Sequence, residues 1–145
     1  MVVGLGNDHV AYELKQQIRA LLESMGHTVV DYGVGQVDSS EYPLSGRAVA
    51  KAVVSGECER GVVLCGTGVG ISLAANKVRG IRCVVCSEPY SAKMARLHND
   101  ANMLALGARV VGPELAKMIV ETFITTGFEG GRHAARVAML EPEEE

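Results

Sequence analysis

A cysteine followed by a glycine-rich run carries the clearest chemical signal in the sequence. Cys65 ends a short apolar run, and the residues that follow are Gly66, Thr67, Gly68, Val69 and Gly70. Glycines let backbone N–H groups converge on one point, and the helical pattern that comes next adds the positive potential of a helix N-terminus. Such a loop binds an anion and stabilises a nearby thiolate, which makes Cys65 a candidate base. The alternative is that Cys65 is an inert core residue and the loop only a turn.

Two clusters combine a histidine with polar neighbours at predicted loop positions. Asp8 and His9 follow the first apolar run, and His98 and Asn99 follow a helical pattern. A single histidine is more often structural than catalytic, but ionisable residues on loops beside other polar groups favour a functional role.

A pair of arginines near the C-terminus indicates a phosphate site. Arg132 and Arg136 are four residues apart, so on a helix they share one face. Two adjacent guanidinium groups suit a phosphate, which they hold through paired hydrogen bonds. The spacing equally fits a solvated basic turn, and Arg109, beside the fifth apolar run, is just as ambiguous.

Two other patterns are rejected on their geometry. Gly4 and Gly6 resemble the start of a dinucleotide-binding fingerprint, but His9 stands where that fingerprint needs a third glycine. Cys83 and Cys86 lie three residues apart inside a predicted strand, where they point to opposite faces and form no zinc or redox pair. We therefore expect no metal and no nicotinamide or other cofactor.

Short apolar runs alternate with longer helical patterns along the chain. We expect strands over residues 1–6, 27–32, 61–65, 81–86 and 103–106, and helices over 11–25, 43–55, 70–78, 89–97, 113–126 and 130–140. Apolar strands that alternate with helices are typical of a parallel sheet covered on both faces. The sequence predicts one α/β domain over residues 1–145, a Rossmann-like three-layer fold with a five-stranded parallel sheet flanked by helices.

Ligands of such folds bind at the carboxyl ends of the strands, where the strand order reverses. The polar groups of this sequence gather at those ends. Asp8 and His9 follow the first strand, the Cys65 loop follows the third, and residues 87–88 follow the fourth. We expect them to line one site.

Composition and charge exclude several functional classes. The 145 residues include 14 basic and 17 acidic ones, a net charge of −3, which does not match the clustered basic excess of a nucleic-acid-binding protein. No apolar run approaches the ~20 residues that span a bilayer. Residues 1–6 lack the charged start of a signal peptide. We expect a cytoplasmic protein with no nucleic-acid or membrane partner, whose four cysteines are reduced.

Taken together, these residues resemble the ribose-5-phosphate isomerase B family, which includes allose- and galactose-6-phosphate isomerases. The similarity spans nearly the whole chain, and its most specific segments are residues 8–9, 42–43, 65–72, 74–77, 80–82, 98–102, 109–112 and 130–133. The resemblance implies a homodimer, sometimes paired into a tetramer, with active sites shared between subunits. The segment from about residue 130 to 145 is then expected to extend toward the partner subunit.

The resemblance also implies catalytic roles. Cys65 matches the family's cysteine base, and Ile71 stands where one branch of the family uses a glutamate, so the chain resembles the cysteine type. Thr67 and the loop amides, including those of Gly66, Gly68 and Gly70, match the group that stabilises an enediolate. His98 matches the residue that assists ring opening, reaching in from the partner subunit with Asn99 and Arg109.

Substrate-binding roles follow in the same way. The residues that match the family's phosphate-binding set are His9, Arg109, Arg132 and Arg136. Asp8 and Tyr42 match residues near the sugar hydroxyls and the ring oxygen. Two departures, Asn7 beside the expected pocket and Glu41 before Tyr42, bear on which sugar fits.

The activity implied is the interconversion of ribose 5-phosphate and ribulose 5-phosphate through a cis-enediolate, with no cofactor. The alternatives are an isomerase of allose 6-phosphate, galactose 6-phosphate or erythrose 4-phosphate, or a sugar-phosphate-binding module without catalysis. His133 is left open between a structural role and a minor contribution to the pocket.

Overall fold

A computed structural model describes residues 1–36 and 41–143 of the chain. Its strands, in sequence order, are β1 (Val2–Asn7), β2 (Thr28–Asp31), β3 (Arg60–Cys65), β4 (Cys83–Val85) and β5 (Met103–Gly107). Its helices are α1 (Tyr12–Ser24), α2 (Tyr42–Val54), α3 (Val69–Asn76), α4 (Pro89–Asn99), α5 (Pro113–Thr125) and α6 (Arg132–Leu140), with a short 3-10 helix, η1 (His9–Ala11). Every strand and helix expected from the sequence is present, with bounds shifted by a few residues.

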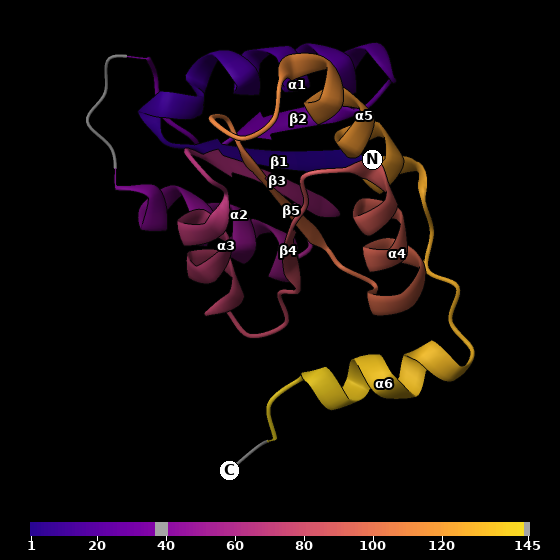
Figure 1. Ribbon diagram of the computed structural model, residues 1–145. Helices are drawn as coiled ribbons and strands as arrows, with labels where there is room; N and C mark the ends of the chain where they lie inside the picture. The colour runs from indigo at the N-terminus through magenta and orange to yellow at the C-terminus, as the bar shows by residue number, and fades with distance from the viewer. Residues whose placement is uncertain (37–40, 144–145) are drawn as a thin grey trace.

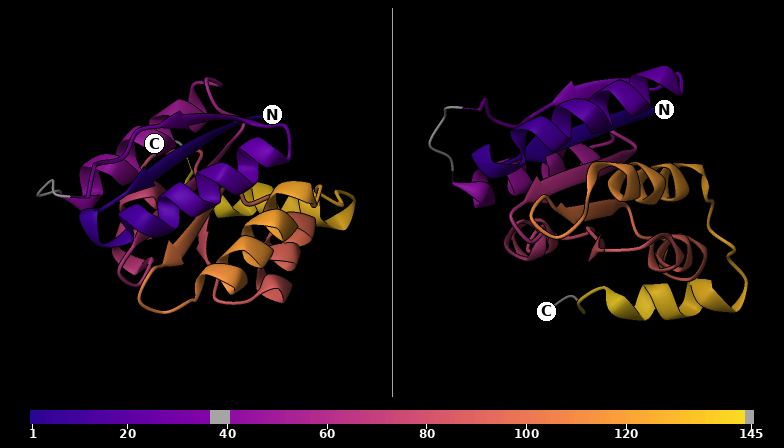
Figure 2. Two further views of the ribbon diagram at one scale, coloured as in Figure 1. Left: turned by 90° about the horizontal axis from the view of Figure 1, so that it is seen from above. Right: turned by 45° about the horizontal axis from the view of Figure 1, so that its top comes forward.

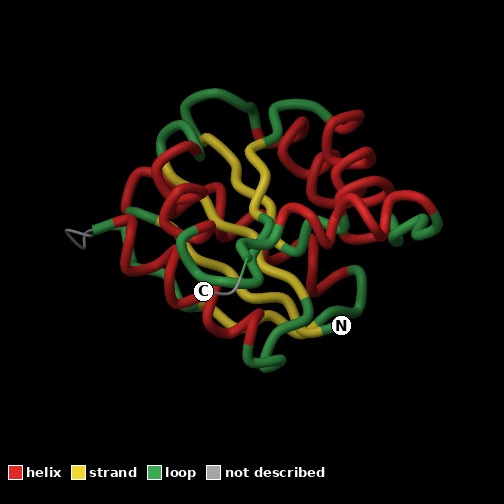
Figure 3. The backbone as a smooth tube through the Cα atoms, turned by 90° about the horizontal axis from the view of Figure 1, so that it is seen from below, coloured by secondary structure: helices red, strands yellow, loops and turns green. Residues whose placement is uncertain are grey.

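The strands form one parallel sheet in the spatial order β2-β1-β3-β5-β4, which lies as a central layer between helices (Figures 1 and 3). Alternating side chains of the central strands build a core on each face of the sheet. Leu64 and Leu106 belong to the core with α1, α4 and α5, whereas Val63 and Ala105 belong to the core with α2 and α3. This arrangement confirms the predicted three-layer α/β fold.

Local sequence signals explain where several helices begin and end. Pro43, Pro89 and Pro113 occupy the first turns of α2, α4 and α5, where the missing N–H of proline has no intrahelical acceptor to lose. Gly26 follows α1 with a positive φ of 90°, the left-handed conformation that commonly ends a helix.

Two glycines of β1 set the distance between the sheet and α2. A Cβ atom on Gly6 would lie 2.7 Å from Oγ of Ser45 and 2.8 Å from Cγ2 of Val49. Gly4 likewise faces Val49 of the helix. Both glycines therefore lie inside the strand and admit a closely packed helix, and neither belongs to a loop that cradles a nucleotide.

Cys83 and Cys86 contribute to different faces of the sheet. Cys83 packs in the core with α2 and α3, and Cys86 packs in the core with α1, α4 and α5. This placement confirms that the two cysteines point to opposite faces of the sheet, as predicted. All four cysteines are free thiols. Among the described residues, no helix has the length and apolar character needed to cross a membrane.

The strand order reverses between β1 and β3, and the register brings their carboxyl ends together. Asn7 at the end of β1 pairs with Leu64, and Cys65 at the end of β3 pairs with Gly107 at the end of β5. The residues that follow these three strands therefore meet at one edge of the sheet, which we call the carboxyl edge.

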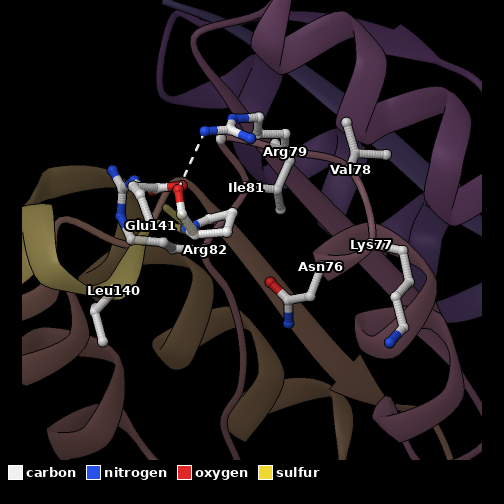
Figure 4. A pocket seen from close by; sticks show the side chains of 10 residues that line it. Asn76, Lys77, Val78, Arg79, Ile81, Arg82, Leu140 and Glu141 are labelled. Carbon is white, nitrogen blue, oxygen red and sulfur yellow. Dashed lines mark hydrogen bonds and ion pairs between the residues drawn. The ribbon is translucent and has the colours of Figure 1, made fainter. Parts of the chain in front are cut away.

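Helix α6 lies outside the three layers, next to α4 (Figures 1 and 2). It exposes Met139 and Leu140, of which 82% and 60% are accessible. Its far end is held to the segment between α3 and β4, where Arg79 donates a hydrogen bond to the carbonyl oxygen of Pro142 at 3.1 Å (Figure 4). Arg82 forms an ion pair with Glu141 at 2.7 Å. A hollow between Asn76, Arg82 and Leu140 separates these contacts from α3.

Candidate active site

The thiol of Cys65 lies at the carboxyl edge under the glycine-rich loop. Its side chain is buried, and Sγ accepts a hydrogen bond from the amide of Gly68 at 3.1 Å. Gly68 precedes α3 in the left-handed conformation, with φ of 84°. The sulfur of Cys65 therefore lies against a backbone donor and beside the N-terminus of α3.

The loop after Cys65 is pressed against the end of β5. A Cβ atom on Gly68 would lie 2.9 Å from the carbonyl carbon of Leu106, and one on Gly107 would lie 2.6 Å from the carbonyl oxygen of Thr67. At the tip of the loop, exposed Thr67 accepts a hydrogen bond from the amide of Val69 at 3.2 Å. Gly107 is a positioning residue that the sequence analysis missed, because its role depends on the β3–β5 pairing.

Arg109 lies beside the same loop, in the same chain. Its amide donates to the carbonyl oxygen of Gly66 at 3.0 Å, and the amide of Ala108 donates to that of Cys65 at 2.9 Å. The side chain is exposed, and its Cδ would lie 3.8 Å from a Cβ on Gly66. The turn after β5 therefore places this guanidinium next to the Cys65 loop of its own chain.

Asp8 and His9 reach the carboxyl edge from β1. The Asp8 amide donates to the carbonyl oxygen of Leu64 at 3.1 Å, which ties the turn to β3. The Asp8 carboxylate caps η1 by accepting from the amide of Ala11 at 3.2 Å. His9 begins η1 and is exposed. An acceptor and a titratable group thus stand near Cys65, as the strand order predicts.

Tyr42 covers the first turn of α3. It begins α2 and is 41% exposed, and a Cβ atom on Gly70 would lie 2.7 Å from Cζ and 3.0 Å from the hydroxyl oxygen of Tyr42. Because Gly70 has no side chain, the ring lies directly over the backbone of the glycine-rich loop. Glu41 is exposed immediately before it.

Asn7 is buried and its side chain binds backbone groups of the segment after β2. Its Oδ1 accepts from the amide of Val34 at 3.0 Å, and its Nδ2 donates to the carbonyl oxygen of Val34 at 3.2 Å and of Asp8 at 2.7 Å. Lys15, also buried, donates to the same Val34 carbonyl and pairs with Asp31 at 2.9 Å. These contacts show that Asn7 fixes the segment after β2, and its expected place beside the substrate stays a prediction.

A second cluster joins α4 to α6. The rings of His98 and His133 are stacked, with centroids 4.3 Å apart and planes 13° from parallel. Glu129, in the segment before α6, lies 3.9 Å from Nε2 of each histidine and donates its backbone N–H to the carbonyl oxygen of Leu97. Arg132 and Arg136 are exposed on α6, one turn apart as predicted. His133, left open by the sequence, therefore belongs to the immediate surroundings of His98.

His133 is the least solvated member of this cluster. Only 6% of it is exposed, and its Nε2 has no hydrogen-bond partner. Burial is the main cause that lowers the pKa of His133, followed by the neighbouring His98, while the carboxylate of Glu129 acts in the opposite direction. Arg132 and Arg136 lower the pKa further.

The same three side chains are the one group of potential metal ligands among residues 1–36 and 41–143, with ligand atoms within 4.8 Å of one another. Ligand lone pairs of a histidine lie in the ring plane, and the two planes here are nearly parallel. The nitrogens of His98 and His133 therefore point side by side and do not converge on one ion at the ~2.0–2.1 Å that zinc requires. We assign no metal to this cluster.

The two clusters lie at opposite edges of the sheet. Helix α4 runs back from the carboxyl edge, and Asn102, just after it, accepts a hydrogen bond from the amide of Gly61 at the start of β3. His98 and Asn99 therefore stand near the amino ends of the strands. The length of β5, on the order of 15 Å, separates them from Cys65. A single chain does not bring His98 to the thiol.

A family model described as Ribose/Galactose Isomerase matches residues 3–140. The chain belongs to the ribose/galactose isomerase family. The match covers both the Cys65 loop and the α4–α6 cluster.

Relatives within the ribose/galactose isomerase family differ in the sugar they are named for. Ribose-5-phosphate isomerase B of Escherichia coli (strain K12) is 52% identical over 138 residues, covering 95% of this chain and 93% of that protein. D-erythrulose-4-phosphate isomerase of Pectobacterium atrosepticum is 43% identical over 139 residues, covering 95% and 91%. The solved structure of Clostridium thermocellum ribose-5-phosphate isomerase B superimposes with a TM-score of 0.94 at 55% identity, covering 97% and 95%.

Proposed function

We propose that this chain interconverts ribose 5-phosphate and ribulose 5-phosphate through a cis-enediolate, with Cys65 as the base. The observation that carries the proposal is the Cys65 thiol at the carboxyl edge, 3.1 Å from a loop amide and followed by further glycine amides at the start of a helix. The 52% identity to a protein named for this substrate supports it.

In the reaction, the Cys65 thiolate removes the proton from C2 of the open-chain sugar. The C2–H electrons form the C1–C2 double bond, and the C1 carbonyl electrons become the negative charge on the C1 oxygen. Amides of the loop, with Thr67, stabilise that charge; one preorganised donor is typically worth about 2.7–4 kcal/mol. The proton then returns from Cys65 to C1, the proton of the C2 hydroxyl passes to the C1 oxygen, and the C2 oxygen becomes the carbonyl of the ketose. The proton transfers within one substrate balance without a cofactor.

The substrate is anchored and opened by the remaining site residues. His9, Arg109, Arg132 and Arg136 hold the phosphate, and Asp8 and Tyr42 contact the sugar hydroxyls and the ring oxygen. His98 donates a proton to the ring oxygen during opening, with Asn99 beside it. Gly66, Gly68 and Gly70 contribute no side chains and leave the backbone accessible to the sugar.

The site so described needs a second copy of the chain. His98 and Arg132 lie on α4 and α6, far from Cys65 of the same chain, and α6 exposes Met139 and Leu140. We infer a homodimer, alone or paired into a tetramer, in which residues 130–143 extend to the partner and complete its site. Residues 144–145 of this segment lie outside the described residues.

A second candidate substrate is a four-carbon sugar phosphate. It is favoured by the 43% identity to a protein named as a D-erythrulose-4-phosphate isomerase. The same chemistry on allose 6-phosphate or galactose 6-phosphate would need room for one more carbon between the phosphate and Cys65. Ranking turnover on these three sugar phosphates and ribose 5-phosphate decides among them.

The proposal is tested with Cys65→Ala, with Cys83→Ala as the matched control in the core of the sheet. The metal-stripped native protein should convert ribose 5-phosphate, Cys83→Ala should retain this activity, and Cys65→Ala should lose most of it while still being stabilised by the substrate. Stabilisation of the native protein by all four sugar phosphates without any turnover would instead show a binding module.

A further inference from the structure

We propose that the stacked rings of His98 and His133 together carry a single proton. Glu129 is the positioning residue that stabilises this protonated pair, and the phosphate of the substrate stabilises it further. This inference rests on the proposed function, in which His98 is the acid of ring opening. It concerns a residue, Glu129, to which the reaction so far gives no role.

The geometry fits one proton and not two. Two imidazolium rings stacked 4.3 Å apart would repel each other across the stack. One imidazolium is compatible with the site, because Glu129 lies 3.9 Å from both Nε2 atoms. Since strongly interacting groups titrate together, the proton belongs to the pair.

Burial decides which ring carries the proton. His133 is 6% exposed with an unpartnered Nε2, whereas 42% of the His98 side chain is accessible. A charged ring is solvated better at His98, so His133 stays neutral and His98 presents the proton. The exposed ring is also the one that a ligand can reach.

The charges around the pair come from three directions. Glu129, from the segment before α6, favours the proton, whereas Arg132 and Arg136 of α6 disfavour a charge on His133. Arg96 of α4 and Asp100, the residue after this helix, form an ion pair with each other at 2.8 Å. A phosphate bound by Arg132 and Arg136 would neutralise their positive charges, which disfavour the proton. The protonated form of the histidine pair is therefore most stable when substrate is bound.

The test is a histidine-detected NMR titration of the native protein and of Glu129→Gln, with Glu121→Gln on α5 as the control of equal charge change. We expect Glu129→Gln to lower the titration midpoint of the pair by about half a pH unit. Inorganic phosphate should raise the midpoint in the native protein. Glu121→Gln should leave it in place. An unchanged midpoint in Glu129→Gln, or no response to phosphate, overturns the proposal.

The pH dependence of kcat distinguishes a role of Glu129 in protonating the histidine pair from a purely structural role. The kcat of Glu129→Gln relative to the native enzyme should recover as pH falls from 8 to 6, because acid then supplies the proton that the carboxylate no longer holds. A structural defect would lower kcat equally at both pH values and would contradict the inference. If the native protein had no isomerase activity, the proposed function would fail, while the NMR titration would still decide the role of Glu129.

Discussion

The amide of Gly68 lies 3.1 Å from Sγ of Cys65, so the loop that begins α3 donates a hydrogen bond back to the end of the strand that precedes it. This contact depends on a backbone that only glycine adopts easily, with φ of 84°. The thiol is therefore coupled to the conformation of the loop that is proposed to stabilise the enediolate.

Replacing Gly68 by alanine should disrupt both functions of the loop. The added Cβ would be strained at a positive φ and would lie 2.9 Å from the carbonyl carbon of Leu106. We expect kcat to fall at least about tenfold, because the donor to Cys65 and the amides beside it shift together. Steady-state kinetics and urea unfolding measure the two effects.

Gly56→Ala is the control for the backbone strain alone. Gly56 has a φ of 85° with open space around its Cβ position. The Gly56→Ala substitution should lower the free energy of unfolding by about 1 kcal/mol with no loss of kcat. An equal loss of kcat in Gly68→Ala and Gly56→Ala would mean that the contact between the Gly68 amide and Cys65 does not contribute to catalysis.

Gly70→Ala should displace Tyr42. The new Cβ would lie 2.7 Å from Cζ of the ring, which has to swing away from the loop. Because Tyr42 is proposed to lie beside the sugar, we expect KM to rise several-fold with a smaller change in unfolding free energy. Gly112→Ala, where a Cβ meets nothing within 4 Å, should leave KM unchanged. A normal KM in Gly70→Ala would remove Tyr42 from the site.

Acidification should destabilise the fold through His133. Burial lowers the pKa of His133 below its ordinary value of 6.5. Between pH 6.5 and that lowered value the unfolded chain binds more protons than the folded one, so stability falls as pH falls through this window and is fully present above it. Urea unfolding at pH 7.5 and 5.5 measures the loss.

His133→Phe keeps a ring in the stack without a titratable group. The loss of stability on acidification should therefore be smaller in this variant than in the native protein. The same pH dependence in both proteins would place the responsible group elsewhere.

Shared active sites predict complementation between two inactive chains. Cys65→Ala and His98→Asn, each with little activity alone, should regain up to about a quarter of native activity when refolded together, because half of the dimers then hold one site with neither substitution. Mixing each variant with itself provides the control. Failure to complement, with dimers formed normally, would mean that His98 serves the site of its own chain.

Much of the fold could be predicted from local signals. Apolar runs gave the five strands, and prolines such as Pro89 marked the first turns of helices because their effect is confined to a few neighbouring residues. The opposite placement of Cys83 and Cys86 followed from the two-residue period of a strand. The Cys65 loop was found because its residues are consecutive.

The features that could not be predicted from the sequence all depend on packing between distant segments. Gly107 makes room for Thr67 only because β5 pairs with β3, and Asn7 is buried because it binds the segment that follows β2. Glu129 lies beside both His98 and His133 because the chain turns back from α5 onto α4. None of these relationships has a fixed spacing in the sequence.

The most direct test of the central claim is the conversion of ribose 5-phosphate in D2O, followed by NMR for the native protein and for Cys65→Ala. The account predicts that the native protein forms ribulose 5-phosphate, with solvent deuterium at C1 to the extent that the Cys65 thiol exchanges its proton before returning it. Cys65→Ala should form this product at least about a hundredfold more slowly. Conversion by Cys65→Ala at the native rate, with the same deuterium content, would contradict the account.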